Sequence, residues 1–87
     1  MEIVFDKTYL RDIYQTGQCN DKKHRYQPNI IRKYIDTINL MKRLHNVTGL
    51  RQYNSLRYEK LKGDKAELSS VRVNDQYRIE FKEYMKD

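Results

Sequence analysis

The hydrophobic pattern in the first half of the chain predicts one short strand and two helices. Residues 2–5 are rich in β-branched and aromatic side chains, as a short strand would be. Apolar side chains recur at helical spacing over residues 9–14, with Asp6 placed to cap that helix and Gly17 to end it. A polar connection leads to Pro28, a residue tolerated in a first helical turn. The strongest helical stripe follows it and consists of Ile31, Tyr34, Ile35, Ile38 and Met41.

The second half of the chain predicts mainly strands. Residues 45–56 show no clear period and are expected to be irregular or to form a short helical turn around Gly49. Strands are expected at about 57–61, 68–73 and 76–82. Because helices come early and paired strands come late, the order indicates an α+β fold rather than alternating βαβ units.

The loop between the last two strands decides which side chains share a face. A two-residue loop would place Val71 and Val73 on the side opposite Tyr77 and Ile79. A three-residue loop, Asn74–Gln76, pairs Val73 with Tyr77 and Val71 with Ile79, and so restores one apolar face. The sequence therefore predicts the three-residue loop.

The same register sets Arg72 directly opposite Arg78 on the other face of the hairpin. Like charges in this position are destabilising, so an anionic group should lie between or beside them. Glu80, diagonal to Arg72, is the ordinary candidate, and a bound phosphate is the functional one.

Charge along the chain is uneven. The 87 residues, enough for one domain, carry 18 Lys and Arg against 12 Asp and Glu, a net charge of +6. Residues 22–43 contain seven basic residues and one acidic residue. Such a cluster indicates a nucleic acid or another polyanion as partner, or else a solubilising surface.

Several classes of protein are excluded or disfavoured. No run of 18 apolar residues is present, so no transmembrane helix is expected, and the first residues do not resemble a secretory signal, which favours the cytoplasm. A lone Cys19 excludes an intramolecular disulfide and a cysteine zinc site. The chain has no Gly-rich phosphate loop, no H-E-x-x-H motif and no nucleophile elbow, so neither a metal nor a cofactor is expected.

Two segments carry a family resemblance: Leu61-Lys-Gly-Asp-Lys65, and Ser70-Val-Arg-Val-Asn-Asp-Gln-Tyr-Arg-Ile-Glu-Phe81. They resemble the L-x-G-D turn and the S-[VI]-R-[VI]-N-D-[QK]-[YW]-R-[IL] pattern of the HigB (host inhibition of growth) toxins of the RelE-like superfamily. The resemblance implies a single domain over residues 1–87, with two helices packed on one face of a small antiparallel sheet and a basic, concave opposite face. It also implies a toxin of a type II toxin–antitoxin pair that cleaves mRNA in the ribosome and is inhibited by a helix-turn-helix antitoxin.

The resemblance also implies roles for individual residues. Arg78 matches an arginine that stabilises the scissile phosphate, and Tyr77 matches a core aromatic residue. Glu59 stands where some relatives have a histidine, so it is either a general base or an ordinary surface carboxylate. The remaining candidates are Arg72 at the phosphate and Lys62, Lys65, Gln76, Arg57 and Tyr58 along the RNA, with Tyr58 stacking on a base.

Other features leave alternatives open. Relatives usually continue into a final strand and tail that supply further acid–base residues, whereas this chain stops at Asp87, so the reaction either uses fewer groups or needs that tail. His24 and His45 are expected to be surface histidines, and residues 22–25 to contact RNA, an acidic antitoxin segment or water. The alternative function is a non-catalytic basic module that binds RNA, the ribosome or the antitoxin.

Overall fold

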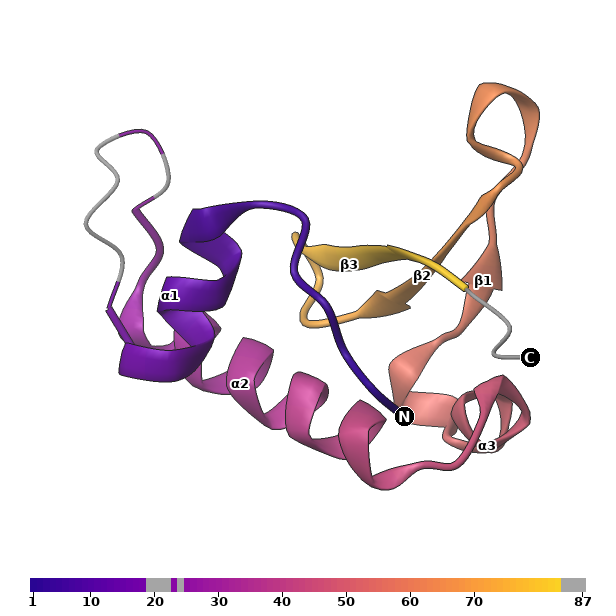
Figure 1. The fold of residues 1–87 in the computed structure, drawn as a ribbon, viewed down its shortest axis with the longest axis horizontal. Coiled ribbons are helices and arrows are strands. Elements are labelled where there is room, and N and C mark those ends of the chain that lie inside the picture. The colour runs from indigo at the N-terminus through magenta and orange to yellow at the C-terminus, as the bar shows by residue number, and fades with distance from the viewer. Residues whose placement is uncertain (19–22, 24, 84–87) are drawn as a thin grey trace. The chain divides into compact units, whose positions relative to one another are not determined.

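Helices occupy the first half of the chain and strands the last third (Figure 1). The computed structural model describes residues 1–18, 23 and 25–83. The chain divides into two units, Met1–Asn46, here the helical unit, and Val47–Asp87, here the sheet unit. In the described part of the chain, three helices and a three-stranded antiparallel sheet confirm the predicted α+β class.

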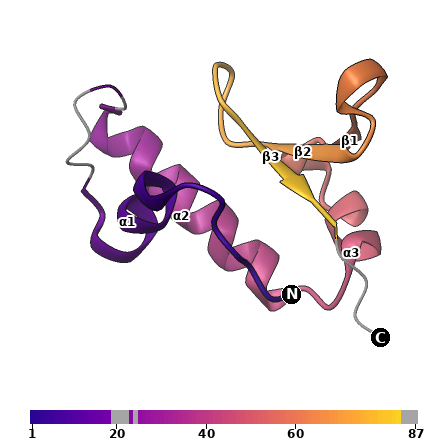
Figure 2. The same cartoon turned by 45° about the horizontal axis from the view of Figure 1, so that its top comes forward.

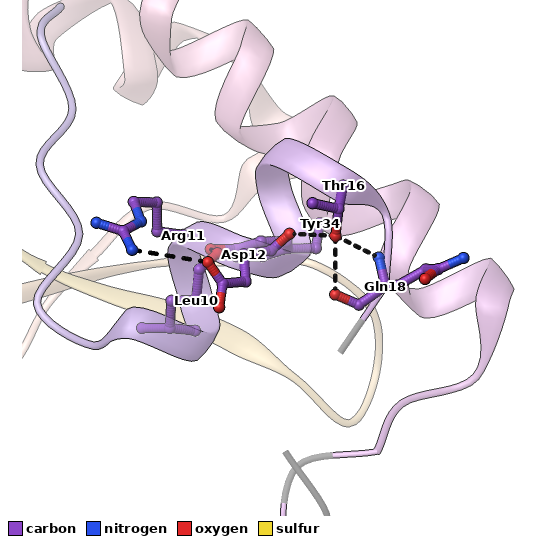
Figure 3. A network of polar contacts seen from close by, with 6 residues as sticks. All are labelled: Leu10, Arg11, Asp12, Thr16, Gln18 and Tyr34. Carbon is purple, nitrogen blue, oxygen red and sulfur yellow. Dashed lines mark hydrogen bonds and ion pairs between the residues drawn. The ribbon is translucent and has the colours of Figure 1, made fainter. Parts of the chain in front are cut away.

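In the helical unit, α1 (Thr8–Thr16) ends where the sequence predicts. Gly17 adopts the left-handed conformation at φ 73°, and its N–H donates to the Ile13 carbonyl at 2.9 Å. The Thr16 hydroxyl donates to the Asp12 carbonyl at 2.7 Å and accepts from the Gln18 N–H at 3.1 Å, which closes the last turn (Figure 3). The Gly17 N–H and the Thr16 hydroxyl therefore satisfy backbone polar groups at the C-terminal end of α1.

The second helix, α2 (Pro28–Arg43), has Pro28 in its first turn and lies against α1 (Figures 1 and 2). Ile38 and Met41 are buried, while the earlier apolar positions of the predicted stripe are half-buried. The Tyr34 hydroxyl donates to the Leu10 carbonyl at 3.0 Å (Figure 3). Its burial, together with the nearby Tyr9 and Tyr26, raises the pKa of Tyr34 well above the ordinary value.

Two predictions for the N-terminal segment are wrong. Residues 2–5 form no strand: the N-terminal ammonium donates to the Lys42 carbonyl at 2.8 Å at the end of α2, and Phe5 packs on Tyr14 at 5.5 Å between ring centroids. β-propensity alone makes no strand without a pairing partner. Asp6 does not cap α1, because the helix begins one residue later and Lys7 holds the N-cap position without a side-chain hydrogen bond.

The sheet unit is built from short elements. Its helical parts are α3 (Val47–Gln52) and two 3₁₀ turns (Asn54–Leu56 and Gly63–Lys65), and its strands are β1 (Glu59–Lys60), β2 (Leu68–Arg72) and β3 (Arg78–Lys82). Strand β2 lies between β1 and β3 (Figure 2). Leu50, Leu56 and Val71 are its buried apolar side chains.

The register between β2 and β3 is the predicted one. Val71 pairs with Ile79 and Arg72 with Arg78, and the Val73 N–H donates to the Tyr77 carbonyl at 2.9 Å across the three-residue loop. The Asn74 side chain accepts from the Gln76 and Tyr77 N–H groups at 2.9 and 2.8 Å and so fixes the loop.

The prediction that Tyr77 is a core residue is wrong, since Tyr77 is 38% exposed. Strand β3 begins only at Arg78, so Tyr77 lies just outside the ladder, at the loop end of the hairpin. Strand β1 is also shorter than the predicted range 57–61. Arg57 has a φ of 46°, and left-handed backbone cannot continue a strand.

Candidate nucleic-acid interface on the sheet

One side of the sheet carries nearly all of its charged residues. Glu59 pairs with Ser70, which pairs with Glu80, and Arg72 pairs with Arg78. Residues directly opposite each other in an antiparallel ladder project from the same side of the sheet. We call this side the polar face; its polar members are Glu59, Ser70, Arg72, Arg78, Glu80 and Lys82, and Leu68 lies opposite Lys82 on the same side.

Arg78 is the most firmly held side chain of the polar face. Its Nε donates to the Ser70 hydroxyl at 2.9 Å, and its Nη2 donates to the Arg57 carbonyl at 2.5 Å. The Glu59 carboxylate lies 4.0 Å from Nη2. About a third of the Arg78 side chain, 34%, is still exposed to solvent. A guanidinium in this setting is fixed by the protein and remains accessible to a ligand.

Arg72, opposite Arg78, forms an ion pair with Asp75 of the hairpin loop. The two arginines therefore have separate anionic partners, Asp75 and Glu59. The prediction that Glu80 is the ordinary partner of Arg72 is wrong. The Glu80 carboxylate instead accepts from the Lys65 ammonium at 3.0 Å. The positive charges of Arg72 and Arg78 are thus compensated by Asp75 of the hairpin loop and by Glu59 of β1.

The lysines contribute to the polar face unequally. Lys65 reaches it through Glu80, and Lys82 pairs with Glu67 at 3.1 Å. Lys62 is exposed and forms no ion pair with any residue in the described ranges. Four cations of this region, Lys65, Arg72, Arg78 and Lys82, are each paired with a carboxylate.

Tyr58 lies on the other side of the sheet. Its hydroxyl shares a hydrogen bond with Ser69 at 3.1 Å and donates to Glu83 at 3.1 Å, and its ring packs on Phe81 at 6.2 Å between centroids. The Arg51 guanidinium lies over the same ring at 5.2 Å. The structure does not bring Tyr58 together with Arg72 and Arg78.

The remaining candidates are spread over two loops and the helical unit. Gln76 is exposed in the hairpin loop, and the Arg57 side chain is exposed before β1. His45 is exposed in the helical unit, whereas His24 lies outside the described residues. Of residues 22–25, only Lys23 and Arg25 are described, and both are exposed.

Ser70 and the Arg57 carbonyl are contacts of Arg78 that sequence reasoning missed. Ser70 is only 1% exposed although its side chain is polar. The predicted register places it two residues before Arg72, on the same face, and opposite Glu80, which was enough to identify it as a neighbour of Arg78. Arg57 gave no signal, since left-handed backbone is usually occupied by Gly or Asn.

A family model described as the RelE-like toxin of the type II toxin–antitoxin system HigB matches residues 3–87. The chain therefore belongs to the HigB-like toxins, and a toxin of a type II pair has a cognate antitoxin as partner. Neither the curated proteins nor the solved structures include a match. In the described part of the chain, no helix is both long enough and apolar enough to cross a membrane.

Proposed function

We propose that this toxin is a ribosome-dependent mRNA endonuclease that cleaves by attack of a ribose 2′-hydroxyl on the neighbouring phosphate. The observation that supports this most is the Arg78 guanidinium, fixed by Ser70 and Arg57 and still partly exposed. Such an attack needs a base for the 2′-hydroxyl, cations for the developing charge on the phosphate and an acid for the leaving 5′-oxygen.

Arg78 is suited to stabilise the transition state. Its guanidinium stays charged at every relevant pH, and its Nη1 side can donate to the phosphate while Nε and Nη2 are held by Ser70 and Arg57. Because Ser70 and Arg57 already hold it, little reorganisation accompanies the reaction. In this proposal Arg72, directly opposite, binds the same or the next phosphate after leaving Asp75.

Glu59 takes the role of the general base. Its carboxylate lies 4.0 Å from the Arg78 guanidinium and is 66% exposed, so a phosphate on Arg78 would bring the adjacent 2′-hydroxyl close to it. Lys62, Lys65, Gln76 and the Arg57 side chain contact the RNA on either side of the scissile phosphate. The antitoxin, in this proposal of the helix-turn-helix class, inhibits the toxin when bound.

A second candidate function is RNA or ribosome binding without cleavage. In the described part of the chain, Glu59 is the only carboxylate within 4.0 Å of the Arg78 guanidinium, and no histidine contacts it. Cleavage with one acid–base group would be slow, because proton transfers by such groups each contribute roughly 10²–10⁴-fold.

The test is primer extension on a translated mRNA in a purified translation system, with Arg78→Ala and Arg78→Lys beside the parental toxin. We expect Arg78→Ala to slow cleavage roughly 10²–10³-fold and Arg78→Lys to recover only part of the loss, since an ammonium cannot keep the planar contacts to Ser70 and Arg57 while it faces the phosphate. Lys60→Ala, an exposed cation on the opposite side of the sheet, is the control and should cleave at nearly the parental rate. Ribosome binding without any cleavage by the parental toxin would favour the second candidate.

A further inference from the structure

The guanidinium of Arg78 is held along one edge by acceptors from two separate segments. Nε donates to the Ser70 hydroxyl at 2.9 Å, and Nη2 donates to the Arg57 carbonyl at 2.5 Å and lies 3.4 Å from the Ser70 carbonyl. Within the described residues, Nη1 has no hydrogen-bond partner. The two acceptors therefore fix the plane of the guanidinium and leave its Nη1 side for a ligand.

The Arg57 carbonyl reaches Arg78 because of an unusual backbone conformation. Arg57 has φ 46° and ψ 54°, and it is the only non-glycine residue with a positive φ in the described ranges. It follows the 3₁₀ turn Asn54–Leu56, to which its N–H bonds through the Asn54 carbonyl at 3.2 Å. Residues held in this region of backbone space need support from their surroundings and are concentrated at functional sites.

Ser70 provides the second acceptor from inside the sheet. It lies on the central strand β2 and is 1% exposed, so its hydroxyl cannot rotate out to water. Ser69, its neighbour, is also buried at 3% exposed, but its hydroxyl bonds to Tyr58 on the other side of the sheet. The two serines are therefore both buried on β2, but only the Ser70 hydroxyl bonds to Arg78.

We propose that Ser70, through its hydroxyl, and Arg57, through its left-handed backbone, are positioning residues that orient Arg78 for the scissile phosphate. This inference rests on the proposed nuclease function. It assigns Arg57 a role that does not depend on its side chain. A misorientation of a catalytic group by about 1 Å is sufficient to slow a reaction by roughly 10²-fold.

The first test compares Ser70→Ala with Ser69→Ala. We expect Ser70→Ala to lower the cleavage rate at saturating ribosome complex roughly tenfold, with the half-saturating concentration changed less than about twofold, because phosphate orientation is lost while binding is kept. Ser69→Ala should leave the rate within about twofold of the parental value. Equal rates for the two variants would overturn the role of Ser70.

The second test removes the Arg57 side chain in three ways, as Arg57→Gly, Arg57→Ala and Arg57→Val. Tolerance of left-handed backbone falls from Gly to Ala to Val, whereas all three lack the guanidinium. We expect the cleavage rate to fall in the same order, with Val roughly tenfold below Gly. Three equal rates would overturn the backbone role and leave only a side-chain contact.

A measurement on the free toxin, without ribosomes or mRNA, separates this inference from the nuclease proposal. In NMR spectra of the free toxin, the Arg78 Nε–H should exchange with water at least about tenfold more slowly than that of exposed Arg32, because it is hydrogen-bonded to a buried hydroxyl. Ser70→Ala should abolish the difference and Ser69→Ala should not. Fast exchange at Arg78 in the parental protein would overturn the positioning role even where mRNA is cleaved, and protected Arg78 without cleavage would overturn only the nuclease proposal.

Discussion

The cations of the helical unit and those of the sheet unit are arranged differently. On α2, Arg32, Lys33 and Arg43 are exposed and form no ion pair with a described residue. On the polar face of the sheet, Arg72 and Arg78 are each paired with a carboxylate, and Arg78 is further fixed by hydrogen bonds. Among the described residues, these three cations of α2 are thus without an ion pair, whereas the two arginines of the polar face are paired with carboxylates.

The difference corresponds to two kinds of polyanion contact. Exposed, unpaired cations attract any phosphate backbone and release its counterions, which gives affinity without selectivity. A phosphate at the compensated cations must displace Asp75 from Arg72 and fit beside Glu59 at Arg78, so a ligand there needs the correct geometry. On the proposed function, α2 contributes ribosome affinity and the polar face provides the reaction geometry.

The largest expected effects concern the two buried cores. Ile38→Ala in α2 and Leu50→Ala in α3 should each lower the free energy of unfolding by about 2–5 kcal/mol, because both side chains are almost fully buried. Ile35→Ala, on the same stripe but half-buried, is the control and should cost clearly less. The measurement is urea unfolding followed by circular dichroism and by tyrosine fluorescence.

The same experiment tests the prediction of a single domain. If residues 1–87 unfold as one domain, Ile38→Ala and Leu50→Ala shift one common transition, and both probes report the same midpoint. If each variant shifts a different transition, the helical unit and the sheet unit unfold separately and the one-domain prediction is wrong.

Local patterns were sufficient to predict much of the sheet unit. The alternation of Val71, Val73, Tyr77 and Ile79 allows only one loop length that keeps them on one face, so the register and the Arg72–Arg78 pair followed from the sequence. The left-handed stop at Gly17 and the first-turn Pro28 followed from backbone chemistry in the same way.

What the sequence could not predict depends on contacts between distant residues. The partner of Arg72 is Asp75 rather than Glu80, because Lys65 from another turn already occupies Glu80. The position of Tyr58 beside the turn favours a contact with RNA, but its side chain bonds to Ser69 and packs on Phe81 on the other side of the sheet. The positive φ of Arg57 depends on the 3₁₀ turn before it and has no signature in its residue type.

The next prediction concerns the exposed cations of α2. Replacing Arg32, Lys33 and Arg43 together with glutamine should reduce the slope of log affinity against log salt for ribosome binding by about 2–3, because each lost phosphate contact accounts for roughly 0.7–0.9. Co-sedimentation with ribosomes between about 0.05 and 0.2 M salt measures the slope. An unchanged slope would show that α2 is only a solvated surface.

Tyr34 predicts a pH dependence of stability in the helical unit. Burial raises the pKa of Tyr34 in the folded protein, so above the unfolded value of about 10 the folded chain binds one more proton than the unfolded chain. The stability from this group is therefore fully present below pH 10 and falls above it, by at most about 1.4 kcal/mol per pH unit. Tyr34→Phe should lose that part of the decline in urea melts between about pH 9 and pH 11, and Tyr53→Phe, an exposed tyrosine, should keep it.

The smallest expected effect tests whether the carboxylates compete with phosphate on the polar face. Asp75→Asn removes the partner of Arg72, and the exposed ion pair it breaks is worth about 0–1 kcal/mol, so RNA affinity should rise no more than about fivefold. The control is Asp64→Asn, which changes the net charge equally but is exposed and pairs with no described cation. Filter binding at fixed salt compares the two variants. A larger gain for Asp75→Asn means that Arg72 is released for phosphate, whereas equal gains mean that only net charge matters and that the two units do not differ in the way they bind a polyanion.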